Sequence, residues 1–185
     1  LFQNAGIHYE LAAKSEDCEN SSSLRAIEQW INLEARFGGT TGNTAKIEQA
    51  IRRGEHLLAL GETSERLSIM GSAHKRLAGL QTVPAEVNAS LVKAAQFYRR
   101  AAKKQDQEQC GDPYPILNWL AIEAVLGNAK VPYESWLSKA AVLAKQRFQD
   151  RRSVWDLFTV ADIAVVRAYQ KGTLPDEHDS LVETY

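Results

Sequence analysis

The side chains of this sequence that could do chemistry are four histidines, two cysteines and a pair of glutamates that recur at equivalent positions. A cysteine next to a histidine could supply the nucleophile and base of a peptidase, and the same residue types bind zinc. No histidine stands at metal-ligand spacing from a cysteine or another histidine, and both cysteines fall in polar segments between expected helices. The sequence therefore predicts no catalytic residue, no metal site and no cofactor. The histidines and cysteines considered are His8, His56, His74, His178, Cys18 and Cys110.

Two further patterns resemble functional sites only superficially. Glu34 and Glu123 could act as an acid–base pair if they met, but they occupy separate repeats, so we expect each to lie near an arginine or lysine of a neighbouring helix. The glycine-rich run at 38–42 lacks the lysine of a phosphate-binding loop and is interpreted as a helix stop followed by a turn.

The composition limits the classes of function. The 185 residues suit one domain, and 22 basic against 23 acidic residues give a net charge of -1. A near-neutral chain has no bulk attraction to nucleic acid or to an anionic membrane. No apolar run approaches the length of a membrane span. Two cysteines exclude a disulfide scaffold and suit free thiols in a reducing compartment, so we expect a cytoplasmic protein. From the charge and the apolar runs, we expect no nucleic-acid or membrane partner.

The beginning of the chain predicts a fragment. The sequence starts at Leu1 rather than methionine, and a helical pattern is under way by Ala5. Leu1, Phe2 and Gln3 also match the end of a common tag-removal protease site, although they could equally be native. We expect residues 1–185 to form a single helical-repeat domain of a larger protein.

Apolar residues follow one another at three- and four-residue spacing along almost the whole chain, and the period-2 alternation of strands is absent. This pattern predicts an all-α fold with eight or nine helices. Helix stops are expected at glycines, namely Gly38–Gly39, Gly61, Gly79, Gly127 and Gly172.

An internal repeat organises these helices. Residues 26–38 align with residues 115–127 at an offset of 89, with identities that include Trp30/Trp119 and Glu34/Glu123. A second pattern interleaves with the first, since Ala5, Tyr9 and Ala12 recur at the same offset as Ala94, Tyr98 and Ala101. Two-helix units of about 45 residues that cannot bury their apolar faces alone stack into a superhelical solenoid. We expect the alanines to allow close helix contacts, and the tyrosines and tryptophans to fill the core.

These motifs resemble the tetratricopeptide (TPR) repeat. Leu67, Met70, Gly71 and His74 match the spacing of its first helix, and the Ala–Tyr–Ala pattern matches its second. The period is longer than the TPR value of about 34 and closer to that of HEAT-like repeats. The resemblance covers most of residues 4–170. It implies a right-handed superhelical solenoid of antiparallel hairpins that acts as a non-enzymatic scaffold or regulatory module. The partner would be a protein, a peptide or another domain of the same chain.

The resemblance also suggests where a partner would bind, because the first helices of TPR hairpins line the concave face. We expect their exposed positions to form a polar groove for an acidic or mixed-charge segment. Glu28 replaces the lysine that a carboxylate clamp would need, so that clamp is not expected. The positions are Arg25, Glu28, Asn32, Arg36, Glu65, Ser68, Ser72, Lys75 and Arg76, followed in a third first helix by Tyr114, Leu117 and Ala121.

Three alternatives stay open. The chain could be the helical accessory domain of a multidomain enzyme, since similar repeats occur in large bacterial proteins joined to a caspase-like peptidase. A basic stripe could bind nucleic acid or be an ordinary solvated helix face; its residues are Arg99, Arg100, Lys103 and Lys104. The proposed groove itself could be solvated surface.

Overall fold

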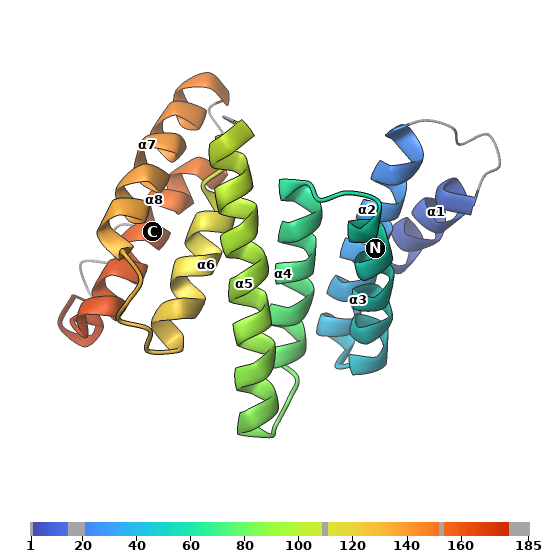
Figure 1. Ribbon diagram of the computed structural model, residues 1–185, viewed down its shortest axis with the longest axis horizontal. Helices are drawn as coiled ribbons and strands as arrows, with labels where there is room; N and C mark the ends of the chain where they lie inside the picture. Colours follow the sequence, from blue (N-terminus) through green and yellow to red (C-terminus); the bar gives the residue numbers. More distant parts are fainter. Residues whose placement is uncertain (1, 15–20, 109–110, 152–153, 178–185) are drawn as a thin grey trace. The chain divides into compact units, whose positions relative to one another are not determined.

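A computed structural model describes residues 2–14, 21–108, 111–151 and 154–177. These residues form helices and connecting loops, with no strand in the described ranges, so the prediction of an all-α helical repeat is confirmed (Figure 1). A short helical segment at 174–177 follows the last long helix. The long helices are α1 (Phe2–Lys14), α2 (Ser21–Thr41), α3 (Thr44–Ala59), α4 (Ser64–Ala78), α5 (Pro84–Glu108), α6 (Tyr114–Val125), α7 (Tyr133–Arg151) and α8 (Val154–Lys171).

The contacts divide the chain into two compact units. The first unit is Leu1–Phe97 and the second unit is Tyr98–Tyr185, with the boundary inside α5. Each unit is described below by itself. None of the described helices combines the length and apolarity needed to cross a bilayer.

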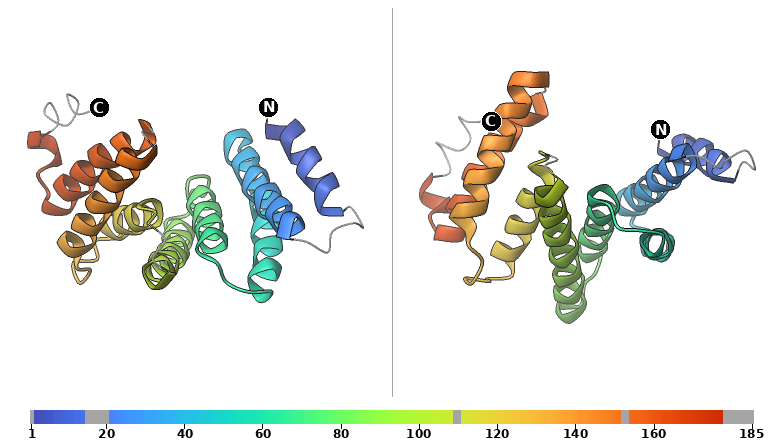
Figure 2. Two further views of the ribbon diagram at one scale, coloured as in Figure 1. Left: turned by 90° about the horizontal axis from the view of Figure 1, so that it is seen from above. Right: turned by 45° about the horizontal axis from the view of Figure 1, so that its top comes forward.

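In the first unit, each helix packs on the next one along the chain. Figure 2 shows α1 lying along α2, and α2 also packs on α3, which packs on α4. Helix α4 contacts α2 as well, which is the arrangement expected for successive first helices of hairpins. The core between them contains Ile31, Ile47 and Met70. A Cβ atom at Gly54 would overlap the sulfur of Met70, so the glycine is what lets α3 approach α4 closely.

In the second unit, α7 packs on α8, and α6 contacts both. Trp119 is buried and meets Trp136 edge-on, with ring centroids 5.3 Å apart, as suits aromatic pairs. Leu120 and Leu137 are also fully buried. Tyr98 and Ala101 of this unit are completely buried, and so is Ala94 near the end of the first unit, as the Ala–Tyr–Ala pattern predicts for this copy.

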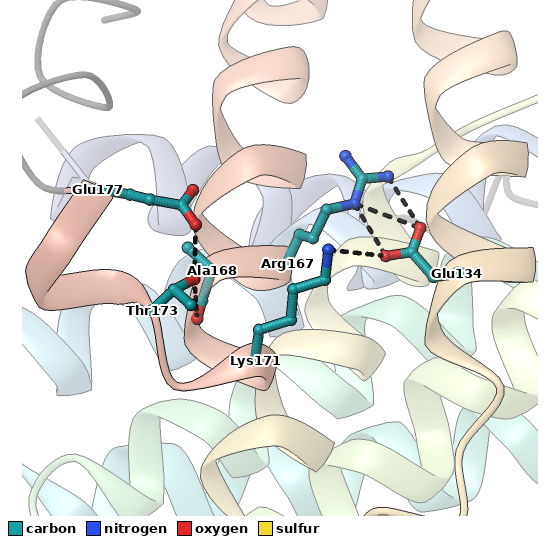
Figure 3. Close-up of polar contacts among 6 residues, drawn as sticks. All are labelled: Glu134, Arg167, Ala168, Lys171, Thr173 and Glu177. Atoms are coloured by element: carbon teal, nitrogen blue, oxygen red, sulfur yellow. Dashed lines mark hydrogen bonds and ion pairs between the residues drawn. The ribbon is translucent and has the colours of Figure 1, made fainter.

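Polar contacts join the ends of α7 and α8 at the surface of the second unit (Figure 3). Glu134 accepts hydrogen bonds from Arg167, at 3.0 Å from Nε to Oε1 and 3.2 Å from a terminal nitrogen to Oε2. Lys171 adds an ion pair at 4.0 Å. Beyond α8, the Thr173 hydroxyl lies 2.6 Å from a Glu177 carboxylate oxygen and donates a hydrogen bond to it.

Some sequence predictions about local structure are wrong. Helix α2 does not stop at Gly38–Gly39 but runs on to Thr41, and Gly42 ends it with a φ of 69°. Gly38 serves close packing instead, because a Cβ there would lie 2.7 Å from Ile47 Cγ1. Tyr9 is expected in the core but is 39% exposed. Trp30 is half-buried rather than fully enclosed.

Candidate functional site

The face predicted to bind a partner comes from α2 and α4, so their mutual orientation decides what it looks like. Arg66 at the start of α4 bonds Glu28 in the early part of α2, whereas Arg76 at the end of α4 packs on Gly39 near the end of α2. These two contacts show that α2 and α4 run parallel, with like ends together. The two helices therefore present an N-terminal end and a C-terminal end of the predicted face.

The predicted residues divide into three classes of exposure. Glu28, Ser68 and Ser72 were expected at the surface and are buried, so that expectation is wrong. The reason lies in α4, where every residue from Arg66 to His74 is buried. Nine consecutive residues make more than two turns, so this stretch is covered on all sides and has no solvent face. The exposed residues are Arg25, Arg36, Glu65 and Lys75, while Asn32 and Arg76 are half-buried.

Glu28 and Arg66 form a buried ion pair that organises the N-terminal end. Arg66 Nε donates to Glu28 Oε1 at 2.7 Å, and a terminal nitrogen donates to the Gly61 carbonyl oxygen at 2.7 Å. The backbone N–H of Arg66 donates to the Thr63 hydroxyl, which caps α4. Arg66 thereby connects α2, the α3–α4 loop and α4. Glu28 is neutralised inside the protein and cannot oppose an acidic partner at the surface.

The C-terminal end carries three cations, whereas Arg25 is an exposed cation of the N-terminal end. The stem of Arg76 packs on α2, because a Cβ at Gly39 would lie 3.2 Å from Arg76 Cδ. Arg76 also donates hydrogen bonds back to the hydroxyl and carbonyl oxygens of Ser72. Arg36 lies one helical turn before Gly39 and is exposed. We call Arg36, Lys75 and Arg76 the cationic end.

A second feature of the first unit is a pair of cation–aromatic contacts that the sequence did not predict. Arg53 on α3 lies over the ring of Trp30, 4.1 Å from its centroid, and pairs with Glu34, so the expected cationic neighbour of Glu34 is found. Lys46 lies 5.6 Å from the centroid of Phe37 in the same way. These contacts border a shallow cleft of about 190 Å³ between α1, α2 and α3. Cations recurring at Lys46 and Arg53, seven residues apart on one side of α3, were the available signal.

In the second unit, the other predicted features are placed as follows. Glu123 accepts hydrogen bonds from Trp119 Nε1 at 2.9 Å and from Asn128 at 2.8 Å, both uncharged donors. Tyr114 is exposed as expected, but Leu117 is buried, so its expected exposure is wrong. Within the basic stripe, Arg99 lies 5.7 Å from the centroid of the Trp119 ring.

The titratable residues point to packing rather than to chemistry. His74 is buried and stacks on Phe97 with centroids 5.5 Å apart, and its Nδ1 has no hydrogen-bond partner in the described part of the chain. Burial, aided by the charge of Lys93, lowers the pKa of His74 to about 4. Across the described residues, histidines, cysteines and carboxylates nowhere gather into a group that could hold a metal ion. Cys18, Cys110 and His178 lie outside the described residues.

Comparison with known proteins identifies the repeats. The sequence matches the TPR-S family, described as Tetratricopeptide Repeats-Sensor, over residues 2–123. This range runs from α1 into α6 and contains the α2–α4 face. Searches of curated proteins and of solved structures found no match. Repeats of this class serve generally in protein–protein interaction. With two thirds of its length covered by this match, the chain belongs to the TPR-S family.

Proposed function

We propose that this chain is a non-enzymatic binding module whose cationic end recognises an acidic segment of a protein partner. The observation that carries the proposal is the contact of Arg76 with Gly39, which brings together the C-terminal ends of α2 and α4 on which Arg36, Lys75 and Arg76 stand. Placing the site there narrows the groove predicted from the sequence, because the middle of α4 is buried. The sensor function in the family's name agrees with a domain that acts by binding.

The electrostatics of this face favour an acidic ligand over a basic one. Glu28 is occupied by Arg66 inside the protein. Glu65 belongs to the first turn of α4, at the opposite end from the cations. Isolated exposed ion pairs contribute only about 0–1 kcal/mol each, so useful affinity requires several contacts at once. A cluster of cations also raises the rate of encounter with an acidic partner.

The simplest competing explanation is that Lys75 and Arg76 only stabilise their own helix. Both are in the last turn of α4, where cations interact favourably with the helix dipole. That explanation does not extend to Arg36, which lies before the last turn of α2, nor to the packing of Arg76 across to Gly39. Convergence of cations from two helices is the feature that favours a binding site.

The test compares two double variants with the same change in charge. Arg36→Glu/Arg76→Glu reverses two cations at the cationic end, whereas Arg52→Glu/Lys93→Glu reverses two exposed cations elsewhere in the first unit. Each protein is checked for folding by circular dichroism and is then used, with cross-linking, to capture partners from source cells. We expect the first variant to lose partners that the wild type and the control variant retain. Equal recovery by all three proteins would show that the cationic end is not the binding site.

A further inference from the structure

The shallow cleft between α1, α2 and α3 has no role in the function proposed above. Its volume of about 190 Å³ is smaller than that of sites for whole small molecules, which measure roughly 300–1,000 Å³. An apolar cavity of about 150 Å³ holds a benzene ring, so this cleft has room for one large side chain. We call it the α1–α3 cleft.

The apolar lining of the α1–α3 cleft comes mainly from α2. Trp30, Leu33 and Phe37 line it, and their spacing of three and four residues places them on one side of the helix. All three are half-buried. Ile7 of α1 also lines the cleft and is 49% exposed. An apolar ligand that removes this surface from water is therefore favoured.

Gly6 of α1 leaves the cleft open. Glycine is a poor helix former, because it loses the most conformational freedom on folding. Packing explains Gly38 and Gly54, where an added Cβ would overlap a residue of the neighbouring helix. At Gly6, which lines the cleft, an added Cβ would meet no described atom within 4 Å, so the packing of the fold does not require glycine there. A side chain bound in the cleft would account for it, because a larger residue at position 6 would compete for the same space.

The charges of the lining favour an acidic neighbour for that side chain. Glu34 pairs with Arg53, and Glu10 has a partner of its own. Lys46 makes no ion pair among the described residues, and its ammonium lies 5.6 Å from the centroid of the Phe37 ring, beside the cleft. A carboxylate close to the bound side chain would pair with Lys46, whereas a cation would be repelled by it.

We propose that the α1–α3 cleft binds an aromatic side chain of a peptide segment in which an acidic residue stands next to it. The ring packs on Trp30 and Phe37 in the space left by Gly6, and the carboxylate pairs with Lys46. A cationic ligand is the poorer candidate, because both rings already carry a cation of α3, Arg53 on Trp30 and Lys46 on Phe37. This site shares no residue with the cationic end and does not rest on it.

The test uses a fluorescein-labelled pentapeptide, Gly-Ser-Phe-Asp-Gly with blocked ends, and two twins. Alanine replaces phenylalanine in one twin, and asparagine replaces aspartate in the other. Fluorescence anisotropy with the full chain measures the three affinities. We expect the parent peptide to bind at least about tenfold more tightly than the alanine twin, because burial of a large apolar side chain is worth that factor or more. We expect it to bind about two- to fivefold more tightly than the asparagine twin, as suits one partly exposed ion pair.

Three results would overturn the proposal. No saturable binding of the parent peptide below about 1 mM protein would show that the cleft is not a site for it. Equal affinities of the parent peptide and the alanine twin would show that the ring is not bound. Equal affinities of the parent peptide and the asparagine twin would show that the carboxylate is not recognised.

Gly6→Leu locates the aromatic side chain. It fills space inside the cleft and favours folding of α1, because leucine is a better helix former than glycine. His8→Leu is the matched control, exposed on the same helix and outside the cleft lining. We expect Gly6→Leu to weaken the parent peptide about tenfold or more and the control to leave its affinity unchanged. Equal effects of the two variants would contradict the proposal.

Lys46→Met locates the carboxylate, because it removes the charge and keeps the apolar stem. We expect it to lower the affinity of the parent peptide to that of the asparagine twin, while Arg52→Met, at an exposed position of α3 outside the cleft, changes neither. Unchanged binding of the parent peptide to Lys46→Met would contradict the proposal. The double variant Arg36→Glu/Arg76→Glu should bind this peptide as the wild type does. Loss of binding in that variant would place the peptide on the cationic end and overturn the proposal.

Discussion

Each unit places an arginine against a buried carboxylate, but the two pairs are completed to different degrees. In the first unit, Arg66 donates at 2.7 Å to Glu28 and at 2.7 Å to a carbonyl oxygen, and both side chains are about one tenth exposed. In the second unit, the side chain of Arg147 is 27% exposed and contacts both Asp112 and Asp156, and Asp156 Oδ2 has no hydrogen-bond partner among the residues that the structure describes.

The contrast separates an ion pair that only stabilises the fold from one that could still interact with a ligand. A buried pair whose hydrogen bonds are complete gains little from any ligand, and removal of one partner leaves an uncompensated charge. A pair left incomplete can gain from a ligand that supplies the missing hydrogen bond. Burial and charge alone would have ranked the two pairs together, and hydrogen-bond geometry distinguishes them.

The largest effect is expected when the complete pair is broken. Arg66→Met leaves the buried Glu28 carboxylate without its ion-pair partner and removes the hydrogen bond to the α3–α4 loop. We expect it to lower the free energy of unfolding by about 3–5 kcal/mol. Urea unfolding followed by circular dichroism measures the change. Arg52→Met, at an exposed position of α3, should stay within about 0.5 kcal/mol of wild type. If Arg66→Met lowered the free energy of unfolding no more than Arg52→Met does, the Glu28–Arg66 pair would not be the stabilising pair described here.

Breaking the incomplete pair should cost less. Arg147→Met removes a partly exposed guanidinium whose contact with Asp156 at 3.2 Å is an ion pair without a hydrogen bond from Nε. We expect a loss of roughly 1–2 kcal/mol in the same urea experiment, because the first turn of α8 still compensates Asp156. A cost as large as that of Arg66→Met would mean that both pairs are structural.

The first unit also contains a buried polar atom without a hydrogen-bond partner among the described residues, Nδ1 of His74. Burial lowers the pKa of His74 from 6.5 to about 4, so the folded protein holds it neutral while the unfolded chain takes up a proton. Above pH 6.5 the difference in pKa does not reduce the free energy of unfolding. As the pH falls from 6.5 towards 4, the unfolded chain binds the proton first and the free energy of unfolding decreases. His74→Leu should flatten the fall in unfolding free energy between pH 7.5 and 5, and His56→Gln, at an exposed position, should not.

The smallest effect is expected at the exposed contact of Figure 3. The hydrogen bond from Arg167 lowers the pKa of Glu134, with the charges of Arg167 and Lys171 adding to it. Its contribution to stability is present above the ordinary glutamate pKa and is lost as the pH falls through the lowered value. Arg167→Gln should return the pKa of Glu134 towards its ordinary value in an NMR titration. The melting temperature should hardly change, because exposed ion pairs are weak.

The sequence predicted the helices and their alternation well because both follow from local periodicity. Ala94, Tyr98 and Ala101 recur at a fixed offset from Ala5, Tyr9 and Ala12 and are fully buried, whereas Tyr9 is 39% exposed, so the expected burial holds in the later copy only. The match to the TPR-S family over residues 2–123 rests on the same regularity.

The sequence predicted the surface of α4 poorly. The spacing of apolar residues identifies one buried face of a helix, but it does not show when the polar face is buried as well. Ser68 and Ser72 are polar and follow the expected outward spacing, yet packing encloses both. Serine tolerates this position because it is small and its hydroxyl can bond within the helix. Arg66 stands three residues after the N-cap Thr63 and reaches Glu28, 38 residues earlier in the chain. Only the tertiary arrangement could reveal that contact.

The pairing of Glu28 with Arg66 also has a consequence for folding kinetics. Most helix contacts in the first unit join sequence neighbours, and chains dominated by such short-range contacts fold fast. The ion pair instead joins residues 38 apart on α2 and α4, helices that are not neighbours in the chain, so we expect it to form late in folding. Interactions that form after the transition state slow unfolding and leave the folding rate nearly unchanged. Arg66 should therefore govern how long the first unit stays folded rather than how quickly it folds.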